Sequence, residues 1–599
     1  MKFLLVAINA KYIHSNPAIY SLKAYAGEIP GVQVELAEYT INQQQEEILA
    51  DIYGRRPDAV GFSCYIWNSN MVRGLLAELP KLLPEIKLWL GGPEATYDGE
   101  TLLSQYPMLT GIMVGEGEAT FRELLEYYGG SGEKGLKDIA GLCLPTGYTA
   151  SRGILDMNEL PFPYGELEAF ENKIIYYETS RGCPFRCSYC LSSVEKSVRM
   201  RSMDKVKKEL QYFLDNRVKQ VKFVDRTFNC NREHAIAVWQ YLKENDNSVT
   251  NFHFEISADL LREEEIDLLN SLRPGLVQLE IGVQSVNPAT LKAIERVMDL
   301  ERLEAAVEKI RIGGRVHQHL DLIAGLPYED YESFRNSFNR VYRMRPEQLQ
   351  LGFLKVLKGS AMAEKAKQYG IRYLSCPPYE VLSTDWLSYE DILRLKRIEK
   401  MLELYYNSGQ FGHTLPILER VFTDPFSMYE ELGNFYERKD YLINSPARAH
   451  RYQVLLDFAG ECDRERLPLY RELLTYDMFL RENLKSRPDF AADIAPYKEE
   501  IRCFYRREEE APRYLEGYKG YDSKQLSKMT HLEPFRYPVW DAERLAQELP
   551  DGKRSGQESA EGGLAQEASN QSSSLGFVLF DYSCRNPLNH EAATYVVFL

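Results

Sequence analysis

The sequence predicts an α/β protein in which two series of parallel strands are followed by a mainly helical region. Short apolar runs alternate with helical periodicity over residues 1–145, and the alternation starts again from residue 173. This βαβα order is typical of parallel sheets covered by helices on both faces. Long helical patterns dominate after residue 370, and 599 residues are too many for one core. We therefore expect several domains rather than one.

The first series should form a doubly wound sheet with five parallel strands. Its apolar runs are Phe3–Ile8, Val32–Leu36, Ala59–Cys64, Ile86–Leu90 and Gly111–Val114. Helical periodicity lies between them, for example at 18–26, 71–83 and 120–128. Ligands of such sheets bind beyond the carboxyl ends of the strands. The functional residues of this part are therefore expected at those ends.

Four of these carboxyl ends are polar or rich in glycine. They are Asn9-Ala10, Ser63-Cys64, Gly91-Gly92-Pro93-Glu94 and Gly115-Glu116-Gly117-Glu118. Glycine lets a ligand approach the backbone closely. A lone Gly-Gly-Pro usually only turns the chain, but four such ends in one unit favour a ligand site.

Three cysteines, Cys183, Cys187 and Cys190, open the second series with the spacing C-x3-C-x2-C. Three thiolates from one tight loop can converge on a single inorganic centre and leave one metal position open. A structural zinc site normally has four ligands, and no second C-x2-C pair or suitably spaced His is present. Zinc binding and inert buried thiols remain as alternatives.

The second series should form a partial barrel of six strand–helix units. Strands are expected at 174–179, 220–224, 252–256, 277–281, 317–323 and 348–354, with helices near 203–216, 232–245, 262–271, 301–312 and 330–343. Functional residues of barrels stand at the carboxyl ends of the strands. Those ends carry Asp225-Arg226, Glu255-Ile-Ser257, Glu280-Ile-Gly-Val-Gln284-Ser285 and Ala324-Gly325.

The cysteine loop and the Glu280–Ser285 stretch together resemble the radical S-adenosylmethionine (radical SAM) superfamily, over about residues 170–356. The resemblance implies a (β/α)6 partial TIM barrel and a [4Fe–4S] cluster on the three cysteines, with SAM chelating the open iron. It also implies SAM contacts from Tyr189 at the adenine, Asp225 near the amino group, and Glu255, Ser257 and Gln284 around the ribose and carboxylate.

The superfamily's usual Gly-Gly-Glu after the second strand is replaced here by Asp225-Arg226-Thr227, which leaves the partner of the SAM amino group open. Glu255 and Glu280 could also be structural acids that cap or pair.

Residues 1–140, with Gly-Gly-Pro-Glu-Ala-Thr and the stretch from Val114 to Leu125, resemble the cobalamin (B12)-binding domain that precedes some radical SAM domains. The resemblance implies a flavodoxin-like (Rossmann-like) fold and cobalamin contacts from the strand ends, namely Asn9, Ser63, Gly91, Gly92, Gly115 and Glu116. No His of the chain lies in the D-x-H-x-x-G pattern that ligates cobalt, so the lower axial ligand stays open. A flavodoxin-like scaffold with another ligand or none is the alternative.

Charge and hydropathy restrict the partners. The net charge of −16 argues against a nucleic-acid partner and against an anionic membrane surface. Residues 181–226 differ, because they contain 12 Lys or Arg and five Asp or Glu, which fits either a solvated helix face at 204–217 or an anionic ligand. No apolar stretch approaches the ~20 residues that span a bilayer. The first apolar run is too short for a signal peptide, so we expect a cytoplasmic protein.

The C-terminal part shows helical patterns at Tyr389–Tyr406, Leu415–Tyr436 and Leu467–Leu484. The polar, Gly/Ser-rich stretch 550–575 reads as a flexible linker, and the apolar segments beyond it as a strand pair that packs back. The region resembles an uncharacterised C-terminal extension of cobalamin-type radical SAM proteins. The expected boundaries are 1–145 for the cobalamin-binding domain, 146–172 for a linker, 173–356 for the radical SAM core, 357–549 for the helical domain, 550–575 for the linker and 576–599 for the final segment.

Taken together, the resemblances imply a radical SAM enzyme that methylates an unactivated carbon of an unknown substrate through a 5′-deoxyadenosyl radical. Its partners would be an organic substrate and a cellular one-electron donor. The alternatives are a cobalamin-dependent radical SAM enzyme that rearranges a substrate or modifies a nucleoside without methyl transfer, and a non-enzymatic cobalamin or redox sensor. The sequence assigns no catalytic residue and leaves the substrate and the oligomeric state open.

Overall fold

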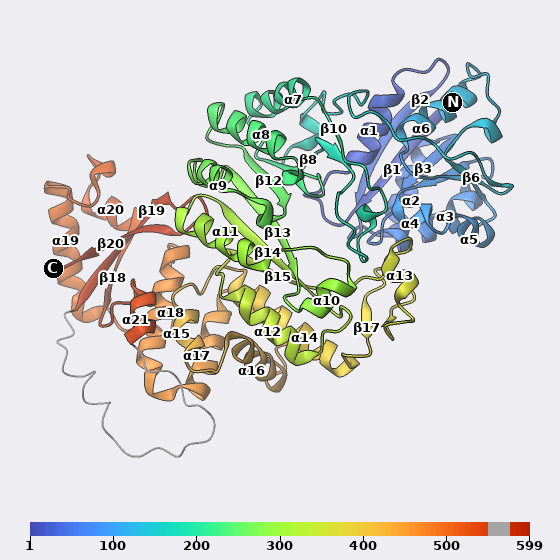
Figure 1. The fold of residues 1–599 in the computed structure, drawn as a ribbon. Coiled ribbons are helices and arrows are strands. Elements are labelled where there is room, and N and C mark those ends of the chain that lie inside the picture. The colour runs from blue at the N-terminus through green and yellow to red at the C-terminus, as the bar shows by residue number, and fades with distance from the viewer. Residues whose placement is uncertain (549–574, 599) are drawn as a thin grey trace. The chain divides into compact units, whose positions relative to one another are not determined.

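The computed structural model describes residues 1–548 and 575–598, and the chain divides into two compact units (Figure 1). The first unit comprises Met1–Tyr331 and Phe353–Tyr389, and the second comprises Glu332–Gly352 and Glu390–Leu599. The expected linker at 550–575 lies outside the described residues except for its last position. The expected domain boundaries stay predictions.

The first sheet of the first unit has the strand order β2-β1-β3-β4-β5-β6-β7. Its five parallel strands are β1 (Lys2–Asn9), β2 (Gln33–Thr40), β3 (Ala59–Ser63), β4 (Lys87–Gly91) and β5 (Leu109–Met113). All five were expected from the apolar runs. The antiparallel hairpin of β6 (Leu142–Leu144) and β7 (Gly147–Tyr148) at the sheet edge was not.

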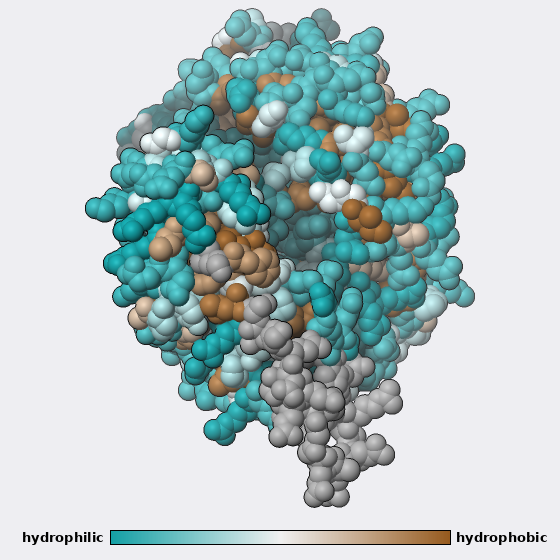
Figure 2. All heavy atoms as spheres, turned by 90° about the vertical axis from the view of Figure 1, so that its left-hand side faces the viewer, coloured by the Kyte–Doolittle hydropathy of each residue, from teal (hydrophilic) through white to brown (hydrophobic). Residues whose placement is uncertain are grey.

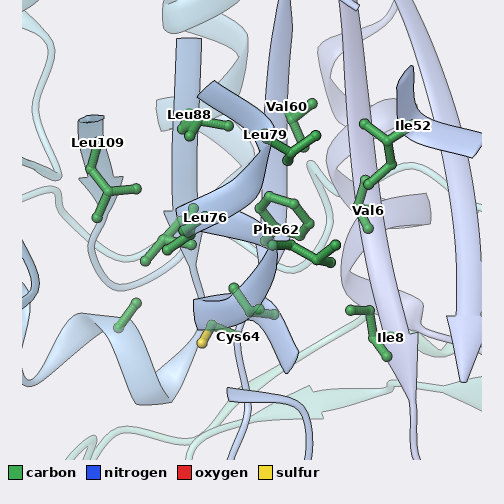
Figure 3. Packing of buried hydrophobic residues seen from close by; sticks show 14 of the residues in the cluster. Val6, Ile8, Ile52, Val60, Phe62, Cys64, Leu76, Leu79, Leu88 and Leu109 are labelled. Atoms are coloured by element: carbon green, nitrogen blue, oxygen red, sulfur yellow. The ribbon is translucent and has the colours of Figure 1, made fainter. Parts of the chain in front are cut away.

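Alternation along the strands gives this sheet two separate cores. In β1, Leu4, Val6 and Ile8 pack with residues of α2 (Gln45–Arg55) and α3 (Ser69–Leu82), as Figure 3 shows for Val6 and Ile8. The intervening residues of β1 pack on the opposite face with α1 (Pro17–Ala26) and α6 (Glu118–Gly129). Successive side chains of a strand point to opposite faces, so a continuous apolar run predicts a sheet covered on both sides. The doubly wound fold is confirmed.

The second sheet carries parallel strands in the order β14-β13-β12-β11-β8 within the first unit. They are β8 (Ile175–Tyr177), β11 (Gln220–Phe223), β12 (Asn251–Ile256), β13 (Val277–Gln284) and β14 (His317–Ala324). The helices between them are α7 (Met203–Asp215), α8 (Arg232–Glu244), α9 (Glu263–Asn270), α10 (Pro288–Ala293) and α11 (Leu300–Gly313). The series continues along the chain with α12 (Tyr331–Tyr342) and β15 (Gln348–Phe353). The expected six strands of a partial (β/α)6 barrel are therefore all present.

The two faces of β12 differ in chemistry, and this difference orients the site. Phe252 and Phe254 are fully buried, and Phe254 packs edge-on against Trp239 of α8. His253 and Glu255 alternate with them and therefore point away from the helices. In neighbouring strands Glu255, Glu280 and His319 stand in register, which gives the side of the sheet opposite the helices an ionisable character.

The described part of the second unit combines helices with a three-stranded antiparallel sheet. The helices include α14 (Tyr389–Met401), α15 (Thr414–Glu419), α16 (Pro425–Arg438), α17 (His450–Cys462), α18 (Leu467–Arg481) and α19 (Lys498–Glu510). The strands β18 (Thr530–Phe535), β19 (Gly576–Arg585) and β20 (Ala592–Val597) pair in that order. The terminal strand pair was expected, whereas the preceding strand β18 was not.

The expected continuous helix over Leu415–Tyr436 is wrong, because the chain breaks between α15 and α16. Asp424 caps the second helix by accepting a hydrogen bond from the Ser427 backbone N–H at 2.9 Å. Pro425 then occupies the first helical position, where its missing N–H costs nothing.

The surface matches the composition. Figure 2 shows one face on which hydrophilic residues predominate and hydrophobic ones form small, separate groups. Among the described residues, no helix has both the length and the apolar character that a membrane span requires.

Candidate functional site

The cysteine loop begins directly after β8, and the carboxylate of Asp225 holds the start of this loop by hydrogen bonds. Asp225, at the end of β11, accepts hydrogen bonds from the Thr179 backbone N–H at 3.0 Å and from the Thr179 and Ser180 hydroxyls at 2.6 Å each. Gly182 then turns the chain at φ +93°, where a Cβ would approach the Ser197 carbonyl oxygen to 2.1 Å. The entry into the loop therefore requires both the acid and the glycine.

The loop brings the thiols of Cys183, Cys187 and Cys190 to one cavity of about 200 Å³. Among the described residues, no three His, Cys, Asp or Glu side chains are grouped so that they could hold one metal ion. A polynuclear cluster needs wider spacing, because each thiolate binds a different iron. Three thiols around one cavity fit such a cluster and do not fit a closed zinc site.

Arg296 lies against the loop. Its guanidinium is 3.7 Å from the Cys187 sulfur and also donates to the Gly282 carbonyl oxygen. Burial raises the pKa of the Cys187 thiol, and the guanidinium opposes that rise. A cation beside a thiolate stabilises its charged form, which is the form that binds iron.

The strand ends of the barrel form the opposite wall of this cavity. Of the five residues expected to contact SAM, Tyr189, Glu255, Ser257 and Gln284 line it. The Gln284 side-chain oxygen is buried without a hydrogen-bond partner among the described residues. Such an acceptor is costly unless a ligand satisfies it, so the wall fits a polar ligand such as SAM.

Asp225 is the exception among these five residues. It is 1% exposed and does not line the cavity, because its oxygens accept the hydrogen bonds from Thr179 and Ser180. The structure therefore gives Asp225 a role in supporting the loop and does not bring it to the place expected for the SAM amino group.

The adjacent carboxyls of Glu255 and Glu280 in this wall have pKa values shifted in opposite directions. Burial, together with the nearby Glu280 carboxylate, raises the pKa of Glu255 to about 7. Burial would also raise the pKa of Glu280, but His253 at 3.0 Å and Lys222 at 2.9 Å hold that pKa well below its usual range. Of these two acids, Glu280 therefore stays ionised at neutral pH, whereas Glu255 gains or loses its proton near pH 7.

A larger cavity, of about 550 Å³, lies at the strand ends of the first sheet. Ser63, Gly91, Gly92 and Gly115 line it as expected. Gly92 has φ +100°, and a Cβ there would approach the Cys64 carbonyl oxygen to 2.6 Å. Gly92 is therefore required by the protein's own packing. A Cβ at Gly115 would meet no atom within 4 Å, so the backbone there is open to a ligand such as a corrinoid.

The other two residues expected to contact cobalamin are not brought to this cavity. Asn9 donates through its amide to the His14 carbonyl oxygen and to Glu38, each at 3.0 Å. Glu116 forms ion pairs with Arg199 at 2.6 Å and Arg181 at 3.2 Å. Neither His14 nor His253 lines the larger cavity, so neither would lie next to a corrinoid bound there.

Arg181 of the cysteine loop connects the two sheets of the first unit. Its guanidinium pairs with Glu118 at 2.6 Å, Glu178 at 2.9 Å and Glu116 at 3.2 Å. Glu116 and Glu118 follow β5 of the first sheet, while Glu178 follows β8 of the second. One side chain therefore ties the cysteine loop to the Gly115–Glu118 strand end.

Four site residues were not assigned roles from the sequence: Tyr65, Arg181, Arg226 and Arg296. Tyr65 lines the larger cavity and stacks on Trp67 with ring centroids 4.4 Å apart. It follows the strand end Ser63-Cys64 directly, so the position of the strand end could have identified it. Arg226 lies in the noted Asp225-Arg226 strand end, whereas no sequence signal pairs Arg181 or Arg296 with their partners.

We predict that Arg181→Gln lowers the free energy of unfolding of the chain by about 3 kcal/mol, because it removes the cation that three partly buried carboxylates share. Glu116 keeps Arg199 as a partner, whereas Glu118 and Glu178 pair with no other cation among the described residues. Urea denaturation should measure this loss. The matched control is Arg122→Gln, which breaks the more exposed Arg122–Glu126 pair and should cost less than about 1 kcal/mol. Equal losses in the two variants would contradict the connecting role.

A second prediction concerns Glu255. Its carboxyl has an ordinary pKa of 4.5 and a folded pKa of about 7, so the folded state keeps a proton that the unfolded chain releases between these values. Its contribution to stability is therefore complete at low pH and falls as the pH rises through 7.

Glu255→Gln lacks this titration. Relative to the wild type, the variant should gain on the order of 2 kcal/mol of unfolding free energy between pH 5 and pH 8. Urea denaturation at the two pH values provides the measurement, and the exposed Glu264→Gln should show no such gain. A wild-type curve parallel to that of Glu255→Gln would exclude the raised pKa.

Comparisons with known proteins agree with this geometry. A B12 binding domain model matches residues 4–125, a Radical SAM superfamily model matches residues 177–341, and a model for a protein of unknown function (DUF4080) matches residues 367–551. The first two matches contain, respectively, the larger cavity's strand ends and the cysteine loop. The B12 domain implies cobalamin, and the radical SAM domain implies a [4Fe–4S] cluster and SAM.

Among curated proteins, the cobalamin-dependent radical SAM methyltransferase TokK of Streptomyces tokunonensis is 24% identical over 496 residues, 74% of this chain and 68% of TokK. Among solved structures, the radical SAM methyltransferase TsrM of Kitasatospora setae, with cobalamin and a [4Fe–4S] cluster bound, has a TM-score of 0.53 at 18% identity. The match covers 63% of this chain and 82% of TsrM.

The cobalamin-dependent radical SAM enzyme OxsB has a TM-score of 0.53 at 15% identity over 80% of this chain and 78% of OxsB. At these identities the structural matches support the fold alone. The three family models show that the chain contains a B12-binding domain, then a radical SAM domain and then a DUF4080 region.

Proposed function

We propose that the protein is a cobalamin-dependent radical SAM methyltransferase that acts on an unactivated carbon of an organic substrate. One observation carries the proposal: the cysteine-lined cavity and the glycine-lined cavity of the first unit share the side chain of Arg226 as a wall. A substrate between the cavities would contact both cofactors. The similarity to TokK, a cobalamin-dependent radical SAM methyltransferase, supports methyl transfer as the outcome.

The chain's residues would divide the work between binding and electrostatics. When bound, the cluster and SAM supply hydrogen-atom abstraction, and cobalamin supplies the methyl group. Cys183, Cys187 and Cys190 would hold the cluster, and Arg296 would favour the thiolate form of Cys187.

In the same cavity, SAM would be held by stacking on Tyr189 of the cysteine loop and by hydrogen bonds with the strand-end residues Glu255, Ser257 and Gln284. The corrinoid would contact the strand-end residues Ser63, Gly91, Gly92 and Gly115. Thr179 and Ser180, held by Asp225, would keep the cysteine loop in place while these ligands bind.

The first test of this proposal is the cluster. We expect Cys187→Ala, reconstituted anaerobically with iron and sulfide, to lose the visible absorption of a [4Fe–4S] cluster, because one of its three protein ligands is missing. Cys230→Ala is the matched control, since Cys230 lies near Cys183 but does not line the cavity. A cluster retained in Cys187→Ala, or lost equally in Cys230→Ala, would refute the assignment.

The second test is the reaction. The reconstituted chain with hydroxocobalamin, a chemical reductant and SAM carrying a deuterated methyl group is incubated with a small-molecule extract of the source cells. We expect S-adenosylhomocysteine together with 5′-deoxyadenosine, and a deuterated methyl on one extract component. Extract-dependent 5′-deoxyadenosine without labelled product would instead indicate a rearrangement or another reaction without methyl transfer, and no cleavage of SAM would indicate a non-enzymatic sensor.

A further inference from the structure

Arg226 occupies the place where the two cavities of the first unit meet. It follows Asp225 at the end of β11, and it is the one described residue that lines both the cysteine-lined cavity and the glycine-lined cavity. The Asp225 side chain points toward the start of the cysteine loop, where it accepts a hydrogen bond from Thr179. Neighbouring residues of an extended strand end point to opposite sides, so the Arg226 side chain points away from Thr179. The Arg226 side chain is exposed toward these cavities rather than packed in the core.

The Arg226 guanidinium makes no hydrogen bond or ion pair within residues 1–548 and 575–598. The other two arginines that line these cavities are engaged, and so is Lys222, which pairs with the cavity residue Glu280. Arg181 contacts three carboxylates, and Arg296 contacts Cys187 and the Gly282 carbonyl oxygen. The ion pairs that join the two sheets therefore leave Arg226 as an available cation at the junction.

The groups around Arg226 indicate the charge of the ligand that its guanidinium would bind. The positive charge of Arg226 opposes the rise in pKa that burial causes at Glu255 and at the Tyr65 hydroxyl. Glu255 nevertheless lies beyond ion-pair distance from Arg226. A ligand that fills the junction would displace water from the guanidinium, and a desolvated cation without a counter-charge is costly. The planar fork of an arginine suits a carboxylate or phosphate, which it can bind through two parallel hydrogen bonds.

We propose that Arg226 binds an anionic group of the substrate, so that the substrate is an organic carboxylate or phosphate held between the two cofactors. The inference rests on the proposed function, which places the substrate at this junction. It narrows the substrate class and makes Arg226 a specificity-determining residue. The same anion chemistry also occurs in the carboxylate of SAM and the phosphate of cobalamin, so the test separates the three sources.

The test is phenylglyoxal modification of arginines in the full chain, followed by peptide mass spectrometry. It is run on the chain alone, with S-adenosylhomocysteine, with hydroxocobalamin, and with both. Each arm is repeated with acetate or inorganic phosphate, with acetamide as the neutral analogue of acetate, and with sodium chloride at matched ionic strength. Arg217 is the matched control, because it is exposed, has no ion pair among the described residues, precedes β11 whereas Arg226 follows it, and lines neither cavity.

We expect Arg226 to stay reactive when S-adenosylhomocysteine and hydroxocobalamin are both present. Acetate or phosphate should then slow its modification about tenfold, the effect of one charge-assisted hydrogen-bonded pair. Acetamide should have no effect, and Arg217 should respond to no probe beyond the sodium chloride control.

Protection of Arg226 by S-adenosylhomocysteine or hydroxocobalamin alone would overturn the proposal, because the guanidinium would then serve a cofactor. Equal protection of Arg217, or none at Arg226, would also overturn it. The arm without cofactors keeps this result separate from the proposed function: a chain that binds no corrinoid or cluster refutes the function, while its response to acetate still reports on the anion site.

Discussion

The ion pairs of Arg181 are the interaction on which the site depends. Three carboxylates from two sheets converge on one guanidinium, and one of them, Glu118, is 5% exposed. Buried carboxylates are tolerated only when they are paired, so the cysteine loop and the Gly115–Glu118 strand end stabilise each other. The two cavities adjoin because this contact holds the loop against the first sheet.

A second constraint is the division of labour among charged groups. Asp225 supports the loop, while its neighbour Arg226 reaches the cavities, because successive residues of an extended segment point to opposite sides. Lys222 and His253 stabilise the charged carboxylate of Glu280, whereas Glu255 pairs with no cation among the described residues and has a pKa of about 7. Chemically similar residues thus acquire different roles from their position on the strands.

Much of this was readable in the sequence. The apolar runs predicted the strands of both sheets, and the cysteine spacing predicted three thiols around one cavity. The strand ends predicted that Ser63, Gly91 and Gly92 lie together at one cavity, because parallel strands bring their carboxyl ends to one edge of the sheet. The sequence could not show which way each side chain at a strand end points, so Asn9, Glu116 and Asp225 were assigned to ligands although they bind protein groups.

Long-range pairings were also beyond the sequence. Arg181 and Glu118 are 63 residues apart, and no periodicity relates them. The break before α16 was missed for another reason: Thr423-Asp424-Pro425 is a cap followed by a proline at the first helical turn, a local signal that the apolar periodicity on both sides concealed.

The central claim is that a corrinoid and a cluster bind in adjoining cavities of one unit. Electron paramagnetic resonance of the chain loaded with cob(II)alamin tests it most directly, with the spectrum recorded first with the cluster oxidised and then with the cluster reduced. We predict that the cob(II)alamin signal broadens or splits on reduction, because paramagnetic centres bound in adjoining cavities interact through space. A cob(II)alamin spectrum that does not change when the cluster is reduced would contradict it.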